Sequence, residues 1–141
     1  MNVRTTPELA AAIDLGSNSF HMIVARVSEG QLQIVDKLRE RVRLAAGLDE
    51  EGFITDHVMD RAMACLERFG QRIGNIPELR VRIVGTNTLR KAKNGAVFRA
   101  RAMKALGHPV EVISGREEAR LIYLGMAQTS EHDEDLSLIH I

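Results

Sequence analysis

Residues 10–25 read AAAIDLGSNSFHMIVA, and this stretch decides the class of fold. It begins with a short apolar run that ends at Asp14. Residues 16–19, Gly-Ser-Asn-Ser, are residue types that favour turns. In residues 20–25 both sets of alternating positions are apolar, except for His21. This pattern is typical of a strand that is buried on both faces. The stretch therefore predicts two antiparallel strands joined by a polar turn.

The next segments extend this pair of strands and then change character. Glu29 and Gly30 indicate a second turn, and a third strand starts at about Leu32, so we expect a three-stranded antiparallel meander. From Thr55 onward the apolar residues recur at helical spacing, and either Thr55 or Asp56 can cap the helix start. The apolar residues of this predicted helix are Val58, Met59, Ala62, Leu66, Phe69 and Ile73.

The second half alternates strands and helices. Residues 81–84 predict a short strand that leads into Gly85, and residues 110–113 predict a fifth strand. Between them we expect one helix from about Thr88 to Gly107, with an apolar face of Ala92, Ala96, Ala100, Met103 and Leu106. Ser114 opens a third helix. The order β-β-β-α-β-α-β-α predicts an α/β fold with a mixed five-stranded sheet and three main helices.

Composition restricts the class of protein. The 141 residues fit one domain, and their 19 basic and 19 acidic side chains leave no net charge to attract a nucleic acid. The single cysteine, Cys65, excludes a disulfide framework and is expected to be a buried apolar side chain. No apolar run reaches the roughly 18 residues that cross a bilayer, and the N-terminus does not resemble a secretion signal. We therefore expect a cytoplasmic protein without membrane insertion.

Polar residues follow three of the predicted strands: residues 14–19, 86–90 and 114–118. Ligands of open α/β sheets bind at the carboxyl ends of strands, so this coincidence is the strongest physical indication of a site. In the first segment, Asp14 is suited to hold Mg²⁺. The turn that follows can direct backbone N–H groups and side-chain donors at a phosphate, from Gly16, Ser17, Asn18 and Ser19. The alternative interpretation of this segment is a plain hairpin turn.

The other two segments each contain one candidate. Arg90 falls in the first turn of its predicted helix, where a cation is unfavourable unless an anion lies nearby, although a solvated arginine is an equal alternative. Ser114 and Glu117 have the spacing of a capping box, so Glu117 has a structural role. Glu118 points about 100° away around the helix and is free to act as a base, or is simply an acid at a helix start.

The remaining polar residues are weaker candidates. His21 lies in a predicted strand and is expected to be packed or half-exposed rather than catalytic. His57, His108 and His132 do not have the spacing of zinc ligands. The alternating arginines at positions 39, 41 and 43 would lie on one strand face, which is more typical of a solvated surface than of a polyanion site.

Taken together, residues 12–22, 84–90 and 113–123 closely resemble the exopolyphosphatase and guanosine pentaphosphate phosphohydrolase (Ppx/GppA) family. The resemblance covers roughly residues 10–128. It implies the N-terminal lobe of a protein of the actin-like ATPase superfamily, with a ribonuclease-H-like fold and a second lobe across a cleft.

The resemblance also implies roles for the candidate residues. Residues 16–19 would form the first phosphate loop, and Asp14 would help to place Mg²⁺. Arg90 would grip the substrate phosphate, Glu118 would be the general base, and Glu117 would support its helix. The expected substrate is the end of a polyphosphate chain, because residues 85–90 look closer to that branch. The alternatives are guanosine pentaphosphate as substrate, a non-catalytic regulatory lobe that binds this nucleotide, or a plain interaction domain.

We expect three parts in the chain. Residues 1–9 would be a flexible N-terminal segment, residues 10–128 the lobe itself, and residues 129–141 a truncated or non-native end, since His140 stands where the family has an aspartate. A lobe without the second phosphate loop has only one wall of the cleft. We therefore expect negligible turnover from this chain alone, and a homodimer for the full-length protein.

Overall fold

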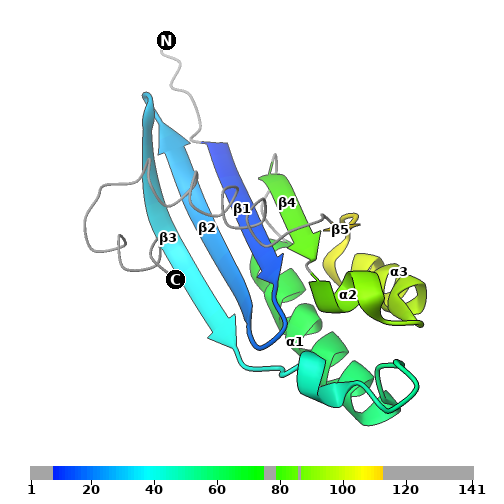
Figure 1. Ribbon diagram of the computed structural model, residues 1–141. Coiled ribbons are helices and arrows are strands. Elements are labelled where there is room, and N and C mark those ends of the chain that lie inside the picture. The colour runs from blue at the N-terminus through cyan, green and yellow to red at the C-terminus, as the bar shows by residue number, and fades with distance from the viewer. Residues whose placement is uncertain (1–7, 75–78, 86, 113–141) are drawn as a thin grey trace.

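The computed structural model describes residues 8–74, 79–85 and 87–112 of the chain (Figure 1). Its elements in order are β1 (Glu8–Leu15), β2 (Phe20–Ser28), β3 (Gln31–Glu40), a 3₁₀ turn (Ala45–Gly47), α1 (Asp56–Ile73), β4 (Leu79–Gly85), α2 (Asn87–Lys91), α3 (Gly95–Leu106) and β5 (Glu111–Val112). The five strands form one sheet in the order β3-β2-β1-β4-β5. The first three strands are antiparallel, whereas β4 and β5 run parallel to β1. The predicted mixed five-stranded sheet is therefore confirmed.

The first half of the chain folds as its local pattern predicts. β2 and β3 turn at Glu29 and Gly30, which both have positive φ, 52° and 78°. α1 begins after Thr55, whose hydroxyl accepts a hydrogen bond from the Val58 N–H (3.4 Å), so Thr55 rather than Asp56 is the cap. The strand expected to begin at Ala10 starts two residues earlier, at Glu8.

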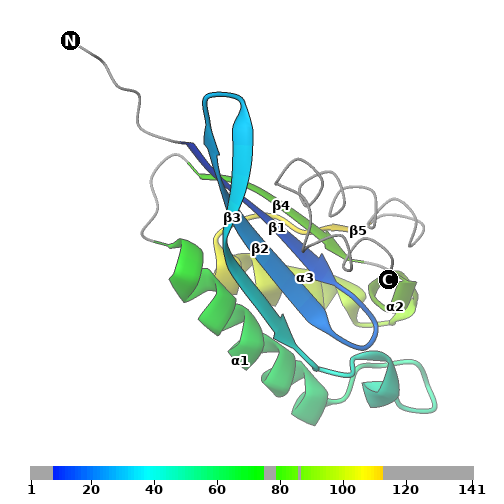
Figure 2. The ribbon, with the colours of Figure 1, turned by 90° about the vertical axis from the view of Figure 1, so that its left-hand side faces the viewer.

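Both long helices pack on one face of the sheet (Figure 2). The core beneath them contains Phe20 from β2, Phe69 from α1 and Phe98 from α3, each at most 1% exposed. The Phe20 and Phe98 rings meet edge to face, with centroids 6.4 Å apart. Burial of these rings supplies much of the free energy that holds the helices on the sheet.

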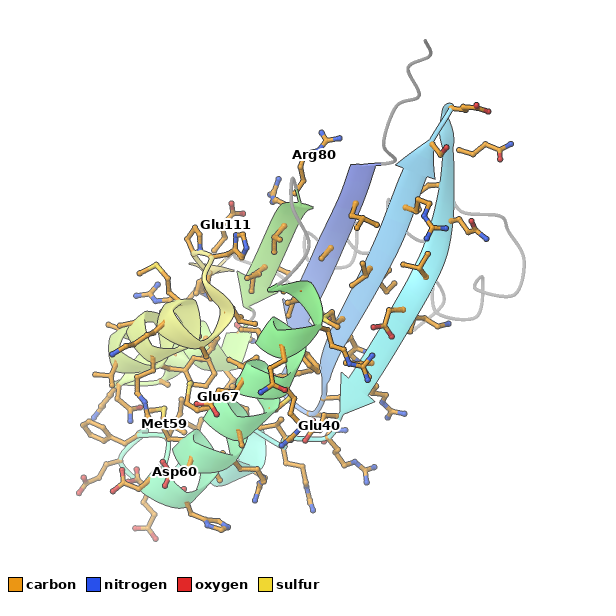
Figure 3. All side chains as sticks on the ribbon, turned by 180° about the vertical axis from the view of Figure 1, so that it is seen from behind. Glu40, Met59, Asp60, Glu67, Arg80 and Glu111 are labelled. Atoms are coloured by element: carbon orange, nitrogen blue, oxygen red, sulfur yellow. The ribbon has the colours of Figure 1, made fainter. Side chains whose placement is uncertain are left out.

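Ion pairs join α1 to the edge strand β3. Arg72 contacts Asp36 (2.7 Å), and Arg68 pairs with Glu40, which Figure 3 shows at the end of β3 beside α1. All four side chains are partly exposed, so these pairs stabilise the packing only modestly. They nevertheless set how α1 lies along the edge strand.

The single helix expected between Thr88 and Gly107 is wrong, because the chain forms two helices with a break at residues 92–94. The break is held from outside the helix. The Asn94 side-chain amide bonds to both the N–H and the C=O of Ile54, at 2.8 and 3.0 Å. The Lys93 N–H bonds to the Gly52 C=O (2.9 Å). In a continuous helix the Lys93 N–H would bond to the C=O four residues earlier and lose its contact with Gly52.

The predicted apolar face of this region is also partly wrong. Ala96, Ala100 and Met103 are exposed, whereas α3 turns Gly95, Phe98, Ala102 and Leu106 into the core. Three of the expected residues carry small or flexible side chains, so the bulky Phe98 determines which face packs on α1 and β2. The end of the helix at Gly107 is as expected, because this glycine has a left-handed backbone (φ 80°).

Within the described ranges, no helix has the length and apolarity that crossing a membrane requires.

Candidate functional site

Three strand ends lie side by side at one edge of the sheet. β1, β4 and β5 are parallel neighbours, and their last residues form one row in which Leu15 pairs with Gly85 and Gly85 pairs with Val112. The arrowheads of β1 and β4 therefore point to the same end of the molecule (Figure 1). The polar segments that follow β1 and β4 start from adjacent positions, as ligand sites of α/β sheets require.

The loop between β1 and β2, residues 16–19, is a tight turn. The Gly16 N–H bonds to the Ser19 C=O (3.2 Å), and a Cβ on Gly16 would lie 3.0 Å from that same oxygen. Glycine is therefore the residue that fits this turn with least disturbance. The Ser19 hydroxyl oxygen is buried and has no hydrogen-bond partner within the described part of the chain. An unpaired buried hydroxyl is unusual in a folded protein and costs free energy unless a partner is supplied.

One side-chain contact joins this loop to the start of α2. The hydroxyls of Ser17 and Thr88 lie 2.7 Å apart, although the residues are 71 positions apart in the chain. Thr88 is buried, whereas Arg90 is exposed and donates to the Asn87 Oδ1 (2.5 Å). The loop and the helix that carries Arg90 are therefore held against each other, and the guanidinium lies at the surface of α2.

Asp14 lies on the face of the sheet opposite to α1 and α3. Its neighbours Ile13 and Leu15 are in the core, so its side chain projects the other way and is partly buried. His21 and Arg39 are its successive cross-strand neighbours on β2 and β3. Burial holds the pKa of His21 below its ordinary value, and the positive charge of Arg39 lowers the pKa further. At neutral pH this row therefore contains an uncharged imidazole.

The donor set near the loop suits one kind of metal site. Among the residues the structure describes, no group of three or more His, Cys, Asp or Glu side chains could hold a metal ion. Magnesium does not need such a cage, because it is commonly held by one or two carboxylates together with substrate phosphates and water. The carboxylate of Asp14, beside the hydroxyls of the loop, fits that arrangement.

The structure leaves part of the predicted site undescribed. Ser114, Glu117 and Glu118 lie outside the described residues, as does Thr86.

Cys65 is buried in α1, as expected, and burial raises the pKa of its thiol, with a hydrogen bond and the charge of Glu40 acting in the same direction. The thiol is therefore protonated and inert at neutral pH.

A second attachment of the loop was missed by sequence reasoning. The Arg43 N–H bonds to the Asn18 C=O (2.8 Å), and the Ala45 N–H bonds to the Ser17 C=O (2.9 Å). The expectation that three alternating arginines share one strand face is wrong, because β3 ends at Glu40, before the second and third of them. The alternation of apolar and charged residues beyond Glu40 is typical of a strand, so it gave no signal of these contacts.

These contacts close a ring around the candidate site. From Ala45 the chain continues to Gly47, whose C=O accepts from the Thr55 N–H (3.0 Å). The adjacent Ile54 is bonded to Asn94, and the chain leads from there back through α2 to the Ser17 contact. The loop, the segment after β3 and the α2–α3 junction are thus positioned by one another.

A mixed sheet of this order, with a polar turn and a polar helix start at its parallel strand ends, is a ribonuclease-H-like lobe of the actin-like fold. Residues 23–140 match the Ppx/GppA phosphatase family. The chain belongs to that family.

Two curated relatives are about half identical to the chain. A guanosine-5′-triphosphate,3′-diphosphate pyrophosphatase of Pseudoalteromonas atlantica is 48% identical over 134 residues, which are 95% of this chain and 27% of the relative. The protein of the same name from Vibrio cholerae is 51% identical over 130 residues, 92% of this chain and 26% of the relative. The chain thus spans about a quarter of the length of these relatives.

Solved structures share the fold. The Aquifex aeolicus member of the Ppx/GppA family superposes with a TM-score of 0.76 at 29% identity, over 86% of this chain and 40% of that protein. An exopolyphosphatase from Cytophaga hutchinsonii superposes with a TM-score of 0.75 at 31% identity, over 86% and 39% of the two chains.

Proposed function

We propose that the chain is the phosphate-binding lobe of a hydrolase that removes the terminal phosphate of guanosine pentaphosphate, the 5′-triphosphate 3′-diphosphate of guanosine. The relatives that are 48% and 51% identical bear the name of a pyrophosphatase for this nucleotide. The exopolyphosphatase from Cytophaga hutchinsonii is 31% identical. The balance of similarity therefore favours the nucleotide over polyphosphate, which the sequence of residues 85–90 had led us to prefer.

The observation that carries this proposal is the row of strand ends formed by Leu15, Gly85 and Val112, together with the Ser17–Thr88 contact. Hydrolysis of a phosphoanhydride needs little covalent help from the protein, which must position the phosphoryl group and neutralise its charge. Donors of residues 16–19 would hold the phosphoryl oxygens. Arg90, on the helix attached to that loop, would supply a positive charge that matches phosphate in two-point fashion.

Asp14 would hold the magnesium ion that the family resemblance implies. When bound, the metal would supply positive charge to the phosphoryl oxygens. The protein would contribute the position of the Asp14 carboxylate, which is partly buried on the sheet beside the loop. Partial burial keeps the carboxylate away from bulk water, which strengthens its attraction for a cation.

Glu118 is proposed as the general base that accepts a proton from the attacking water, and Glu117 as a helix-start residue that supports it. The assignment rests on the capping-box spacing and the family resemblance, since both residues lie outside the described part. A positioned carboxylate of this kind typically contributes about 10²–10⁴-fold to the rate.

The decisive experiment compares Glu118→Gln with Glu117→Gln in the complete gene product. We expect Glu118→Gln to lower phosphate release from guanosine pentaphosphate by about 10²–10⁴-fold while nucleotide binding persists. The matched Glu117→Gln variant should retain most of the rate and most of the stability, because glutamine also completes a capping box. If the wild-type protein binds the nucleotide tightly and releases no phosphate, the lobe serves a regulator and the hydrolase proposal fails.

Substrate preference needs a separate measurement. The values of kcat/KM for guanosine pentaphosphate and for long-chain polyphosphate, determined side by side with the same preparation, should favour the nucleotide. A clear preference for polyphosphate would favour an exopolyphosphatase instead. The same site can serve either substrate, because both present a terminal phosphoanhydride to the same loop.

A further inference from the structure

Arg43 lies in an unusual place for an arginine. It follows the end of β3, between Val42 and Leu44, which are 1% and 0% exposed, while its own side chain is exposed. The two buried neighbours fix the backbone on either side of it. Its N–H is bonded to the Asn18 C=O (2.8 Å), so this arginine is attached directly to the candidate phosphate loop.

The backbone of Arg43 is strained. Its φ is 60°, in the left-handed region that glycine and asparagine adopt readily and other residues rarely do. Glycine would be the less costly residue here. Strained positions of this kind are typical of functional sites, where a side chain is needed despite its conformational cost. Glu29, the other described non-glycine residue with positive φ, lies in a hairpin turn, whereas Arg43 follows a strand end and is bonded to the candidate loop. Its long, charged side chain therefore calls for an explanation in terms of function.

The guanidinium of Arg43 is not used to hold the described structure together. Other arginines are engaged: Arg68 and Arg72 pair with acids on β3, and Arg61 donates to the Val42 C=O (2.8 Å). Within the described ranges, no ion pair or side-chain hydrogen bond involves the Arg43 guanidinium. Its five donors are thus available to an anion.

The topology of the sheet defines where this charge lies. The loop of residues 16–19 joins β1 to β2, and α2 follows β4, the neighbour of β1. Arg43 follows β3, the neighbour of β2. Thr88 and Arg43 therefore contact the loop from opposite sides, Thr88 through Ser17 and Arg43 through Asn18. A linear polyanion that extends from α2 across the loop would reach the segment that contains Arg43.

We propose that Arg43 is a phosphate-binding residue that takes the phosphate groups next to the terminal one in a linear oligophosphate. The inference rests on the proposed function, since it presumes that the terminal phosphate is held between the loop and α2. It makes Arg43 the residue that distinguishes a chain of phosphates from a single phosphate.

The test measures binding of two probes to the complete gene product by titration calorimetry in Mg²⁺ buffer. One probe is inorganic phosphate, and the other is a methylene-bridged tripolyphosphate analogue that resists hydrolysis. In Arg43→Gly we expect the Kd of the analogue to rise about tenfold or more, as loss of a charge-assisted hydrogen bond predicts, with little change in the Kd of phosphate. The thermal midpoint should stay the same or increase, because glycine relieves the strain.

Two further variants make the result specific. Arg43→Asn also tolerates a left-handed backbone and should reproduce the loss of analogue binding. Arg99→Gln removes the same charge from an exposed position on α3 and should leave both affinities unchanged. Equal weakening of both probes would mean that the loop is distorted, and unchanged affinities would mean that Arg43 is merely solvated; either result overturns the inference.

The outcome also separates this inference from the proposed function. Wild-type protein that releases phosphate from guanosine pentaphosphate, combined with unaltered analogue binding in Arg43→Gly, would contradict the role of Arg43 alone. Wild-type protein that releases no phosphate, combined with selective loss of analogue binding in Arg43→Gly, would contradict the hydrolase proposal alone.

Discussion

The hydroxyl of Ser17, in the turn between β1 and β2, lies 2.7 Å from the hydroxyl of Thr88, in α2. This contact joins the first segment of the candidate site to the second across 71 positions of sequence. It connects the turn that would hold a phosphate with the helix that carries Arg90.

Removal of one hydroxyl should leave the other partly buried and unpaired. Thr88→Val, which preserves side-chain shape, should lower the free energy of unfolding by about 1–3 kcal/mol. Urea unfolding of the 141-residue chain measures this. The double variant with Ser17→Ala should cost less than the sum of the two single variants, by at least about 0.5 kcal/mol, because both remove the same bond. Strictly additive effects would mean that the two hydroxyls do not interact in solution.

Asn94 should be important for the junction between α2 and α3. Asn94→Ala removes two hydrogen bonds to the backbone of Ile54, at 2.8 and 3.0 Å, and should destabilise the chain by about 1–3 kcal/mol. Asn94→Asp keeps the acceptor for the Ile54 N–H but sets a carboxylate oxygen against the Ile54 C=O, so it should also destabilise the chain. Hydrogen exchange of the Ile54 amide is the direct measurement. Undiminished protection in Asn94→Ala would show that the Asn94 side chain does not hold the backbone of Ile54.

Gly70 tests the close approach of α1 and α3. A Cβ at this position would lie 2.5 Å from the Ala105 C=O, a backbone atom that cannot move aside alone. Gly70→Ala should therefore destabilise the fold by about 1–3 kcal/mol, although alanine is the better helix former by about 1 kcal/mol. Gln71→Ala, at the neighbouring exposed position, should stay within about 0.5 kcal/mol of wild type. A stabilised Gly70→Ala would show that the helices lie further apart.

His21 should make stability depend on pH below neutrality. Its folded-state pKa is lowered from 6.5 by burial and by Arg39, whereas the unfolded chain takes up a proton normally. The unfolded state then binds more protons, so stability rises with pH and is lost as pH falls from 6.5 through the folded pKa. His21→Gln should flatten this part of the profile. An imidazole NMR titration midpoint at or above 6.5 would contradict the prediction.

Asp14 should determine the response to magnesium. Chelation should abolish phosphate release by the complete gene product, and added Mg²⁺ should restore it. In Asp14→Asn the Mg²⁺ concentration for half-maximal release should rise by about 10–100-fold. Asp36→Asn removes an acid that pairs with Arg72 on the helix side of the sheet, so it should leave this value unchanged. The same Mg²⁺ requirement in Asp14→Asn and wild type would remove Asp14 from the proposed metal site.

Sequence reasoning succeeded where a structure depends on neighbours in the chain. The meander of β1 to β3 follows from alternation and turn residues. The start of α1 follows from Thr55, and the end of α3 follows from the left-handed Gly107. The resemblance to the Ppx/GppA family was likewise readable from three short motifs, and the family match confirms it.

The predictions from sequence were wrong where contacts between distant segments determine the local structure. The face that α3 buries depends on Phe98 meeting Phe20, and the break before α3 depends on Asn94 meeting Ile54. Neither partner is visible from the pattern of the helix itself, because alanine and methionine fit a buried or an exposed position almost equally well. Arg43, which follows β3, was predicted to lie in a strand because its backbone contact with Asn18 is likewise not visible in the local pattern.

The amino-acid sequence by itself determined the antiparallel strands, the cap at Thr55 and the helix end at Gly107, because alternation, capping and turn geometry are interactions within a few residues. Its short motifs also identified the family. The tertiary structure alone decided that the turn at Ser17 meets Thr88 and that Arg43 is attached to Asn18. These contacts form only after the sheet order β3-β2-β1-β4-β5 has brought the segments together, and packing rather than local preference sets that order.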